Sequence, residues 1–262
     1  MCGGAIGEDS AVRKARIEVK GWAWMVGLGI GLGCAGVWAE EKVMESGPER
    51  LAMVELFTSE GCKSCPVAEE WLSRLKEREG LWTKFVPVAW HVDTWDSLGW
   101  KDRWSSASFS QRQWAYAKGW GKDSVETPAF VLNGREWAKV EEGSLTAVGP
   151  MAGKLRVKIM GNRVEVFWTP MVAASKSQRA FLAPMRSGIQ SEVTAGENVG
   201  RKLTHDFVAG EIVGVELKEK DGVWAGEGRI KEPRDALAVW IKREGEVEPL
   251  QAVGGWLEPL GR

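Results

Sequence analysis

The stretch GCKSCP at residues 61–66 lies between an apolar run at residues 51–57 and a segment at residues 64–79. The apolar run is typical of a buried strand, and apolar residues that recur every three or four positions in the second segment indicate an amphipathic helix. We therefore predict a strand, a turn that carries two cysteines, and a helix, in that order. The charged side chains of this helix, from Glu69 to Glu79, are expected to face solvent.

The predicted turn places Cys62 at the exposed amino end of the helix. Unpaired backbone N–H groups and the helix dipole stabilise an anion there by about 0.3–1 kcal/mol. Lys63 adds a positive charge and Ser64 a hydroxyl donor, so we expect the pKa of the Cys62 thiol to fall below its reference of about 8.5. Cys65 lies one helical turn further along and should be more buried. Cys62 would then attack a disulfide or thiol partner, and Cys65 would resolve the mixed disulfide.

A pair of cysteines with this spacing has two other interpretations. It can form half of a metal site, and His91, at the end of a predicted strand at residues 84–92, could complete a copper or zinc site with both thiolates. The pair can also be a structural disulfide, although so short a loop restricts the unfolded chain little. The strand-to-helix position resembles the thioredoxin-like redox motif and favours thiol chemistry. His205, the second of two histidines, is expected at the surface.

Two further positions belong to this predicted redox site. In thioredoxin-like folds, a proline with a cis peptide bond opens a strand beside the cysteine pair and presents backbone groups to an extended substrate. Thr127-Pro128 precedes the apolar residues 129–132 and fits that position, with a trans proline as the alternative. Glu55, on the strand before the motif, could accept a proton from the resolving thiol, with a surface or ion-paired carboxylate as the alternative.

The first 39 residues indicate an export signal. An uncharged apolar stretch at residues 21–37 ends in Val37-Trp38-Ala39, a small-residue cleavage pattern. Four basic side chains precede it: Arg13, Lys14, Arg16 and Lys20. We predict cleavage after Ala39 and a periplasmic or secreted protein with no membrane segment in its mature form. An uncleaved anchor and a lipoprotein attached at Cys34 are the alternatives.

Removal of the leader would also remove two of the four cysteines, Cys2 and Cys34. The mature chain would keep Cys62 and Cys65 alone. Two cysteines cannot form a four-cysteine zinc site, nor the several bridges of a small disulfide-held scaffold. The remaining cysteine chemistry is therefore that of one local pair.

The composition is that of a globular protein without a charge bias. The chain has 262 residues, which suits one large domain or two modest ones, and 44% of them are hydrophobic and 27% charged. Its 35 Lys and Arg nearly balance 36 Asp and Glu, and its pI is near 6.3. With no excess of positive charge to neutralise phosphates, we do not expect a nucleic-acid partner.

The pattern of elements changes near residue 150. Before it we predict a mixed α/β domain at residues 40–150, with a second helix at residues 109–120 and a hairpin turn at Asn133-Gly134. After it, at residues 151–262, we predict a β-rich domain packed on the first. Its candidate strands include a hairpin around Gly161-Asn162 and the ranges 211–217, 223–230 and 236–242.

Several longer strings closely resemble the exported thioredoxin-like family catalogued as domain of unknown function twelve twenty-three (DUF1223). They are VELFTSEGCKSCP at 54–66, WHVDTWD at 90–96, LGWKD at 98–102, QRQ at 111–113, Thr127-Pro128, and GENVGR at 196–201 with Leu203, His205 and Asp206. The resemblance implies a thioredoxin-type α/β core with an appended β-rich segment, but it names no substrate and gives the GENVGR string no role. Lys63 departs from the small polar residue that many members carry.

The sequence therefore predicts an exported thiol–disulfide oxidoreductase. Cys62 and Cys65 would act on cysteine-containing exported proteins or on a redox partner protein, with no cofactor beyond their own disulfide. One alternative is a module that binds copper or another thiophilic metal through the two cysteines and His91. The other is a non-catalytic binding protein in which the β-rich half does the binding.

Overall fold

The computed structural model describes residues 41–145, 149–173, 177–231 and 234–257, all within the unit at residues 39–262. The predicted leader, with Cys2, Cys34 and the cleavage position, lies outside the described residues. Across the described ranges, no helix is both long and apolar enough to cross a bilayer.

The first half of the unit alternates strands and helices, as predicted. Its elements are β1 (Lys42–Glu45), β2 (Ala52–Thr58), α1 (Cys65–Ser73), η1 (Arg74–Glu77), β3 (Phe85–His91), η2 (Asp93–Trp95), α2 (Ala107–Gly119), β4 (Ala129–Leu132), β5 (Arg135–Glu136) and η3 (Glu142–Leu145). The hairpin turn between β4 and β5 is confirmed, since Asn133 and Gly134 both have the positive φ angles that a tight hairpin turn requires. The predicted first helix is shorter than expected, because η1 replaces its last turns.

The second half consists of strands. They are β6 (Gly153–Met160), β7 (Arg163–Pro170), β8 (Gln178–Arg186), β9 (Ile189–Glu192), β10 (Lys202–His205), β11 (Val208–Ala209), β12 (Val213–Glu216), β13 (Lys218–Lys220), β14 (Val223–Arg229), β15 (Ala236–Arg243) and β16 (Gln251–Trp256). The hairpin between β6 and β7 is confirmed, and so are the three later strands, which correspond to β12, β14 and β15.

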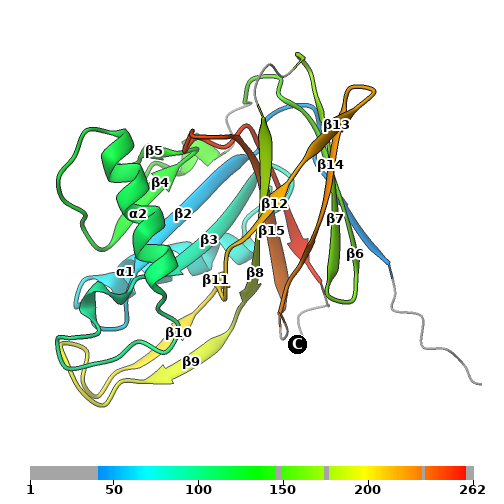
Figure 1. Cartoon of the computed structure of the whole chain (residues 1–262). Coiled ribbons are helices and arrows are strands. Elements are labelled where there is room, and N and C mark those ends of the chain that lie inside the picture. The colour runs from blue at the N-terminus through cyan, green and yellow to red at the C-terminus, as the bar shows by residue number, and fades with distance from the viewer. Residues whose placement is uncertain (1–40, 146–148, 174–176, 232–233, 258–262) are drawn as a thin grey trace, which may run out of the picture. The chain divides into compact units, whose positions relative to one another are not determined.

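A nine-stranded mixed sheet joins the two halves of the sequence (Figure 1). Its order is β16-β15-β8-β11-β3-β2-β4-β5, with β12 paired to β8. The parallel pairing of Val208 in β11 with Ala89 in β3 carries this sheet across the predicted boundary near residue 150. A separate five-stranded sheet has the order β1-β6-β7-β14-β13, and β9 and β10 form a hairpin of their own.

Strand β15 separates two apolar cores. Its side chains alternate between them, because successive residues of a strand point to opposite faces. Ala236, Ala238 and Trp240 belong to the core that also holds Phe57 and Trp90. Leu237, Val239 and Ile241 belong to the core of the β-rich half.

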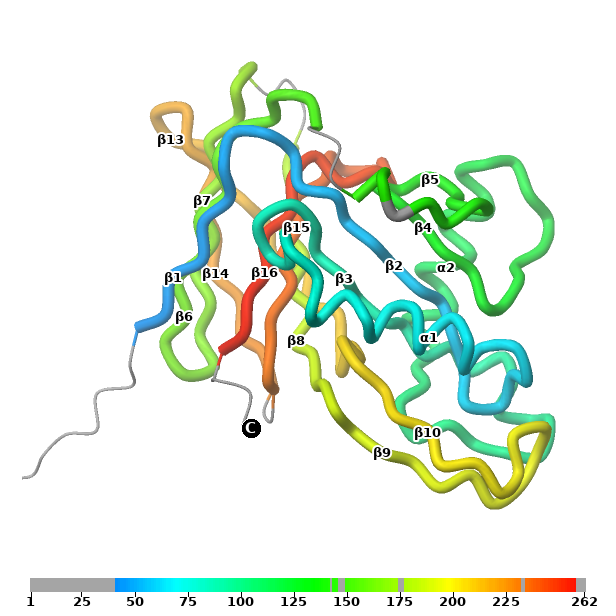
Figure 2. Tube along the Cα trace, turned by 180° about the vertical axis from the view of Figure 1, so that it is seen from behind, coloured from blue at the N-terminus to red at the C-terminus, as the bar shows by residue number. Residues whose placement is uncertain are grey.

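The carboxyl ends of β2 and β3 meet at one edge of the large sheet. The two strands are parallel, and Thr58 at the end of β2 is in register with His91 at the end of β3. The cysteine turn follows β2 at this edge, α1 packs against β2 and β10, and α2 packs against β3. Figure 2 shows the β9–β10 hairpin running beside α1 toward the same edge. Loops at this edge of a sheet are where open α/β folds place their ligand sites.

Candidate functional site

Cys62 and Cys65 form a disulfide in the turn between β2 and α1. The Cys62 backbone N–H donates to the Ser59 carbonyl oxygen at 3.2 Å, and the Cys65 N–H donates to the Cys62 carbonyl oxygen at 3.3 Å. Helix α1 begins at Cys65, with Ser64 as its N-cap and Pro66 in its first turn. Proline is favoured there because a helix leaves its first N–H groups without intrahelical acceptors. Cys62 thus lies three residues before the helix rather than at its first position.

The disulfide is buried, which corrects the prediction of an exposed Cys62. Cys62 is 1% exposed and Cys65 0% exposed. Lys63 and Ser64, between them in sequence, are exposed. The physical reason is that residues 196–201, which connect β9 to β10, pack on the cysteine turn from more than a hundred residues away in sequence.

Asn198 makes the central contact between these two segments. Its side-chain amide, 1% exposed, donates to the Glu60 carbonyl oxygen at 2.8 Å and to the Cys62 carbonyl oxygen at 2.9 Å. The neighbouring Glu197 carboxylate accepts the Lys63 backbone N–H at 3.0 Å. The GENVGR string, for which no role was predicted, therefore packs on the cysteine turn.

Gly196 begins this string and fits a narrow space beside Trp100. Its φ of +74° lies in the left-handed region that favours glycine, and a Cβ atom there would lie 3.1 Å from the Trp100 Cβ. The Trp100 indole N–H donates to the Glu60 carboxylate at 2.7 Å. The loop after β3 and the GENVGR segment thus enclose the turn together.

The Thr127–Pro128 peptide bond is cis, as the resemblance implied. The Cys62 Sγ atom lies 3.5 Å from the Thr127 carbonyl oxygen and 3.5 Å from the Ser64 Oγ atom. The structure therefore brings four of the predicted residues together: Cys62, Cys65, Thr127 and Pro128.

Glu55 points to the other face of the sheet. Its carboxylate accepts hydrogen bonds from Arg112 Nε at 2.6 Å, Trp90 Nε1 at 2.9 Å and Tyr116 Oη at 2.5 Å. Burial disfavours the charged guanidinium, but the Glu55 carboxylate outweighs burial and raises the pKa of Arg112. Side chains alternate between the two faces along β2, and Thr58, an odd number of positions from Glu55, hydrogen bonds to Glu69 in α1. Glu55 therefore points to the opposite face, where it contacts Tyr116 in α2. Glu55 is therefore in a buried ion pair, away from the helix that begins at Cys65.

The acidic residue on the Cys65 side is Glu69. It lies one turn after Cys65 in α1, so the two residues share a helix face. Glu69 is 5% exposed, accepts the Thr58 hydroxyl at 2.5 Å and is hydrogen bonded to His205 Nδ1. The prediction of a solvated Glu69 is wrong, because β10 covers this part of the helix.

His205 is 0% exposed, which corrects the prediction of a surface position. Its Nδ1 contacts Glu69, and its Nε2 lies 3.1 Å from the Glu60 Oε1 atom. Burial favours the neutral imidazole, but hydrogen bonds to the Glu60 and Glu69 carboxylates favour the charged form and raise the pKa of His205 to about 10. The pKa of Glu60 lies below its ordinary value. Burial alone would raise this pKa, but hydrogen bonds, including the one with His205, stabilise the carboxylate and lower it.

His91 lies beside His205, with ring centroids 5.1 Å apart and nearly perpendicular planes. It is 0% exposed, and its Nδ1 lies 2.7 Å from the Asp102 Oδ2 atom. Asp102 is fixed by the backbone N–H groups of Glu60 and Trp104, each at 2.9 Å. Among the described residues, the buried Nε2 atom of His91 has no hydrogen-bond partner.

Glu69, His91 and His205 form a group of possible metal ligands. One donor atom from each lies within 4.8 Å of the others. The group differs from the predicted set of Cys62, Cys65 and His91, since both sulfurs are in the disulfide. His91 was predicted as a possible metal ligand, but Glu69 and His205, which the fold brings to it, were not. Two features of the sequence pointed weakly to these partners. Glu69 lies four residues after Cys65 and therefore on the same helix face, and His205 belongs to one of the strings that resemble the family.

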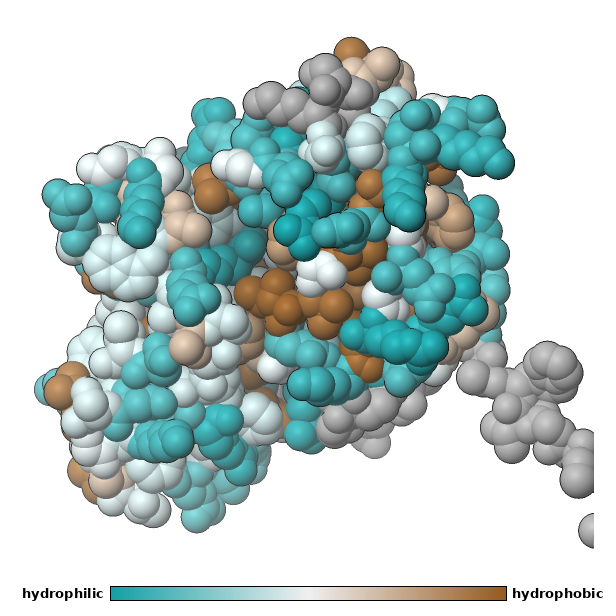
Figure 3. Space-filling view, in the orientation of Figure 1, coloured by the Kyte–Doolittle hydropathy of each residue, from teal (hydrophilic) through white to brown (hydrophobic). Residues whose placement is uncertain are grey.

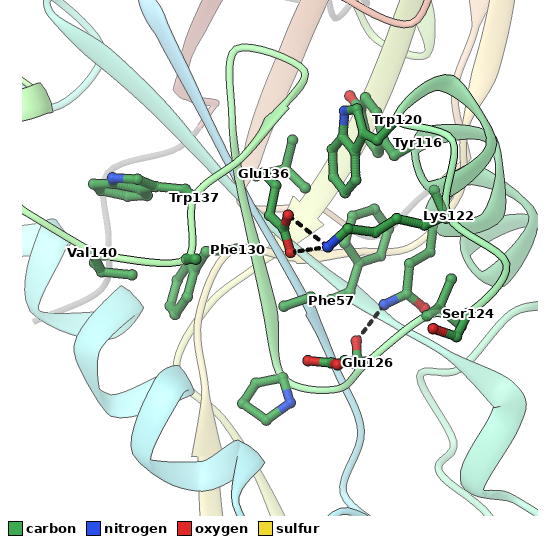
Figure 4. A pocket seen from close by; sticks show the side chains of 17 residues that line it. Phe57, Tyr116, Trp120, Lys122, Ser124, Glu126, Phe130, Glu136, Trp137 and Val140 are labelled. Carbon is green, nitrogen blue, oxygen red and sulfur yellow. Dashed lines mark hydrogen bonds and ion pairs between the residues drawn. The ribbon is translucent and has the colours of Figure 1, made fainter.

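A cavity of about 240 Å³ opens beside Pro128, between α2 and β4–β5. Five aromatic residues contribute to its walls: Phe57, Tyr116, Trp120, Phe130 and Trp137. Figure 4 shows the Lys122 ammonium reaching the Glu136 carboxylate across it, at 2.6 Å from both oxygens. The cavity therefore places both aromatic and charged side chains next to the cis proline.

Two solved structures are similar to this chain. A crystal structure of protein AGR_C_4864 from Agrobacterium tumefaciens has 22% sequence identity and a TM-score of 0.59, covering 82% of this chain and all of that one. HBP35 of Porphyromonas gingivalis has 11% identity and a TM-score of 0.56, covering 83% of this chain and 79% of that one. At these identities the likeness concerns the fold alone.

No curated protein matches the sequence. A family model described as "Protein of unknown function (DUF1223)" matches residues 53–242, most of the chain. The chain therefore belongs to the DUF1223 family.

Proposed function

We propose that this protein is an exported thiol–disulfide oxidoreductase that acts through Cys62 and Cys65 on cysteines of other exported proteins. The observation that carries the proposal is the contact between the disulfide and the carbonyl oxygen before a cis proline, 3.5 Å from Cys62 Sγ. A CxxC turn between a strand and a helix, facing a cis proline, is the arrangement of thioredoxin-like proteins. We propose that residues 40–150 form such a core and that residues 151–262 are an appended β-rich part.

The exchange reaction uses the two sulfurs in sequence. A substrate thiolate attacks Cys62 Sγ, the bond between the two cysteines breaks, and Cys65 Sγ leaves with the electron pair and takes up a proton. The second substrate thiolate then attacks the substrate sulfur of the mixed disulfide, and Cys62 leaves and is protonated. Two electrons and two protons pass from the substrate dithiol to the protein. The reverse sequence reduces a substrate disulfide.

The reaction requires Cys62 to become accessible. Two hydrogen bonds hold residues 196–201 over it: Asn198 donates to the Cys62 carbonyl oxygen, and the Glu197 carboxylate accepts the Lys63 backbone N–H. Residues 196–201 belong neither to the β2–β3 pairing nor to α1, so they can move away with both of these intact. The proposal therefore includes an opening of this segment when substrate binds.

Exposed apolar side chains surround the turn and suit a polypeptide substrate. The face seen in Figure 3 is mainly hydrophilic with separate apolar patches. Val67, two residues after Cys65, is 69% exposed, and Val199, next to Asn198, is 61% exposed. Leu98 is 63% exposed and precedes Gly99, which packs on Gly196. These three side chains offer contacts for an unfolded segment that presents a cysteine.

The proposal is tested by measuring how fast the protein catalyses the reduction of insulin by a dithiol. In the same preparation, thiol alkylation at graded redox potentials measures whether Cys62 and Cys65 are oxidised and reduced reversibly. Cys62→Ser should abolish the catalysed reduction. Cys65→Ser should accumulate a mixed disulfide with the substrate, visible as a mass increase that a reductant removes. Equal activity of both variants and the parent protein would overturn the proposal, as would a parent protein no faster than the dithiol alone.

A further inference from the structure

We propose that Glu69, His91 and His205 bind one divalent transition-metal ion of the zinc class, without the cysteines as ligands. Two imidazoles and one carboxylate form a donor set that zinc sites use. One donor atom from each residue lies within 4.8 Å of the other two. The three side chains come from α1, from the end of β3 and from β10, so only the folded chain assembles them.

The first argument is the unpaired nitrogen of His91. Asp102 fixes Nδ1 at 2.7 Å, and within the described ranges the buried Nε2 has no hydrogen-bond partner. A buried polar atom without a partner is unfavourable, because it has lost its hydrogen bonds to water. Metal-binding histidines typically donate one ring N–H to a carboxylate and use the other nitrogen as the ligand. His91 and Asp102 have this arrangement.

The second argument is charge. Glu60, Glu69 and Asp102 place three carboxylates in the interior, with exposures of 0%, 5% and 1%. Two imidazoles face them, so one negative charge would remain even if both imidazoles were protonated. Unbalanced buried charge is costly, and a divalent cation would balance it.

The distances require a small contraction on binding. Ligand atoms around one zinc ion, at about 2.0–2.2 Å from the metal, lie roughly 3–3.6 Å from one another. The Glu69 carboxylate and His205 Nδ1 are already in contact, so the approach of His91 is the main adjustment. The metal would take the place of the hydrogen bond between Glu69 and His205 Nδ1, and metal binding to imidazoles generally releases protons.

The position of the site separates this proposal from the thiol chemistry. In the disulfide form neither sulfur is a thiolate, so a site built from Cys62, Cys65 and His91 would bind metal only after reduction. A site built from Glu69, His91 and His205 binds metal with the disulfide intact. The metal proposal can therefore be tested independently of the oxidoreductase proposal.

The test uses the untagged full chain in its disulfide form, unfolded with chelator and refolded with Zn²⁺ or Co²⁺. We expect one bound ion per chain, a visible absorption spectrum from bound Co²⁺, and a higher melting temperature with metal. The Cys62→Ser/Cys65→Ser double variant should bind equally well. Binding that requires reduction and is lost in this double variant would overturn the proposal, and so would no binding to the disulfide form.

Substitutions then locate the site. Glu69→Gln should weaken binding at least tenfold, whereas Glu70→Gln, the exposed neighbour on the same helix, should leave it unchanged. Asp102→Asn keeps a similar shape and should weaken binding by about 10–100-fold through His91. Circular dichroism of each metal-free variant monitors folding. If folded Glu69→Gln and Asp102→Asn proteins both retain full affinity, the ion lies elsewhere and the proposal is wrong.

Discussion

The Asn198 side-chain amide donates a hydrogen bond to the carbonyl oxygen of Cys62 at 2.9 Å, across 136 residues of sequence. The same amide group holds the Glu60 carbonyl oxygen. One side chain thus fixes the two backbone positions that flank Gly61 and keeps the disulfide covered.

Asn198→Ala should uncover the disulfide. The change removes both hydrogen bonds and leaves two buried carbonyl oxygens with weaker partners, so we expect a loss of about 1–3 kcal/mol in the free energy of unfolding. Reduction by dithiothreitol, followed by mass-tag alkylation, should become faster than in the parent protein. Val199→Ala, at an exposed neighbouring position, serves as the control. An unchanged reduction rate in a folded Asn198→Ala protein would contradict the covering role of this segment.

Tyr116, the only tyrosine in the chain, should resist ionisation until the protein unfolds. Burial raises its pKa well above the ordinary value of 10.0; Arg112 opposes this effect and Glu55 adds to it. The unfolded chain loses the proton near pH 10 and the folded protein keeps it. The stability that Tyr116 contributes is therefore complete below about pH 10 and declines as the pH rises above it.

Tyrosinate absorbance and tryptophan fluorescence, followed together in an alkaline titration, check this prediction. Both signals should change in one step. A smooth tyrosinate titration near pH 10 in protein that remains folded would show that Tyr116 is accessible. Tyr116→Phe supplies the baseline.

Glu55→Gln should reduce stability without changing the thiols. The substitution leaves the buried Arg112 guanidinium without its charged partner, and breaking such a pair costs about 3–5 kcal/mol. Urea unfolding measures this loss. Because Glu55 faces α2, the rate at which Cys65 is alkylated in the reduced, folded protein should stay within about twofold of the parent, about 0.4 kcal/mol in barrier height. A large change in that rate with little loss of stability would instead support a proton-transfer role for Glu55.

A fragment of residues 40–150 should not fold alone. It lacks β11, whose Val208 pairs with Ala89, and it lacks Trp240, whose ring packs against Trp90 at 6.1 Å between centroids. The edge of β3 and a large apolar surface would be exposed. Circular dichroism and proton NMR should show a poorly ordered chain, and co-expression with residues 151–262 should restore order. A fragment with sharp, dispersed NMR signals would refute this prediction.

Sequence periodicity predicted the elements that are local in the chain. β2, α1, β3 and α2 follow from apolar spacing, and the β4–β5 and β6–β7 turns follow from Asn-Gly and Gly-Asn pairs. The pattern did not identify β8, which contacts both cores and therefore shows no regular alternation of apolar and polar residues.

The candidate site was harder to predict because its parts are far apart in the chain. Glu69 lies on the charged side of an amphipathic helix, and only the packing of β10 against that helix makes the position buried. His205 occurs in a short polar string whose burial depends on the same contact. The spacing of the cysteines indicated their chemistry, but the long-range contact with Asn198 determined that they are covered.

The alternation along β15 also limits how this strand can change in evolution. Ala236 to Ile241 are all buried, and neighbouring residues enter different cores. Insertion or deletion of one residue would turn every later side chain of β15 to the opposite face of the sheet. Trp240 would then enter the core of the β-rich half, in the space that smaller side chains such as Val239 fill. The length of β15 should therefore be invariant among relatives that keep this architecture, while the loops at its two ends are free to vary.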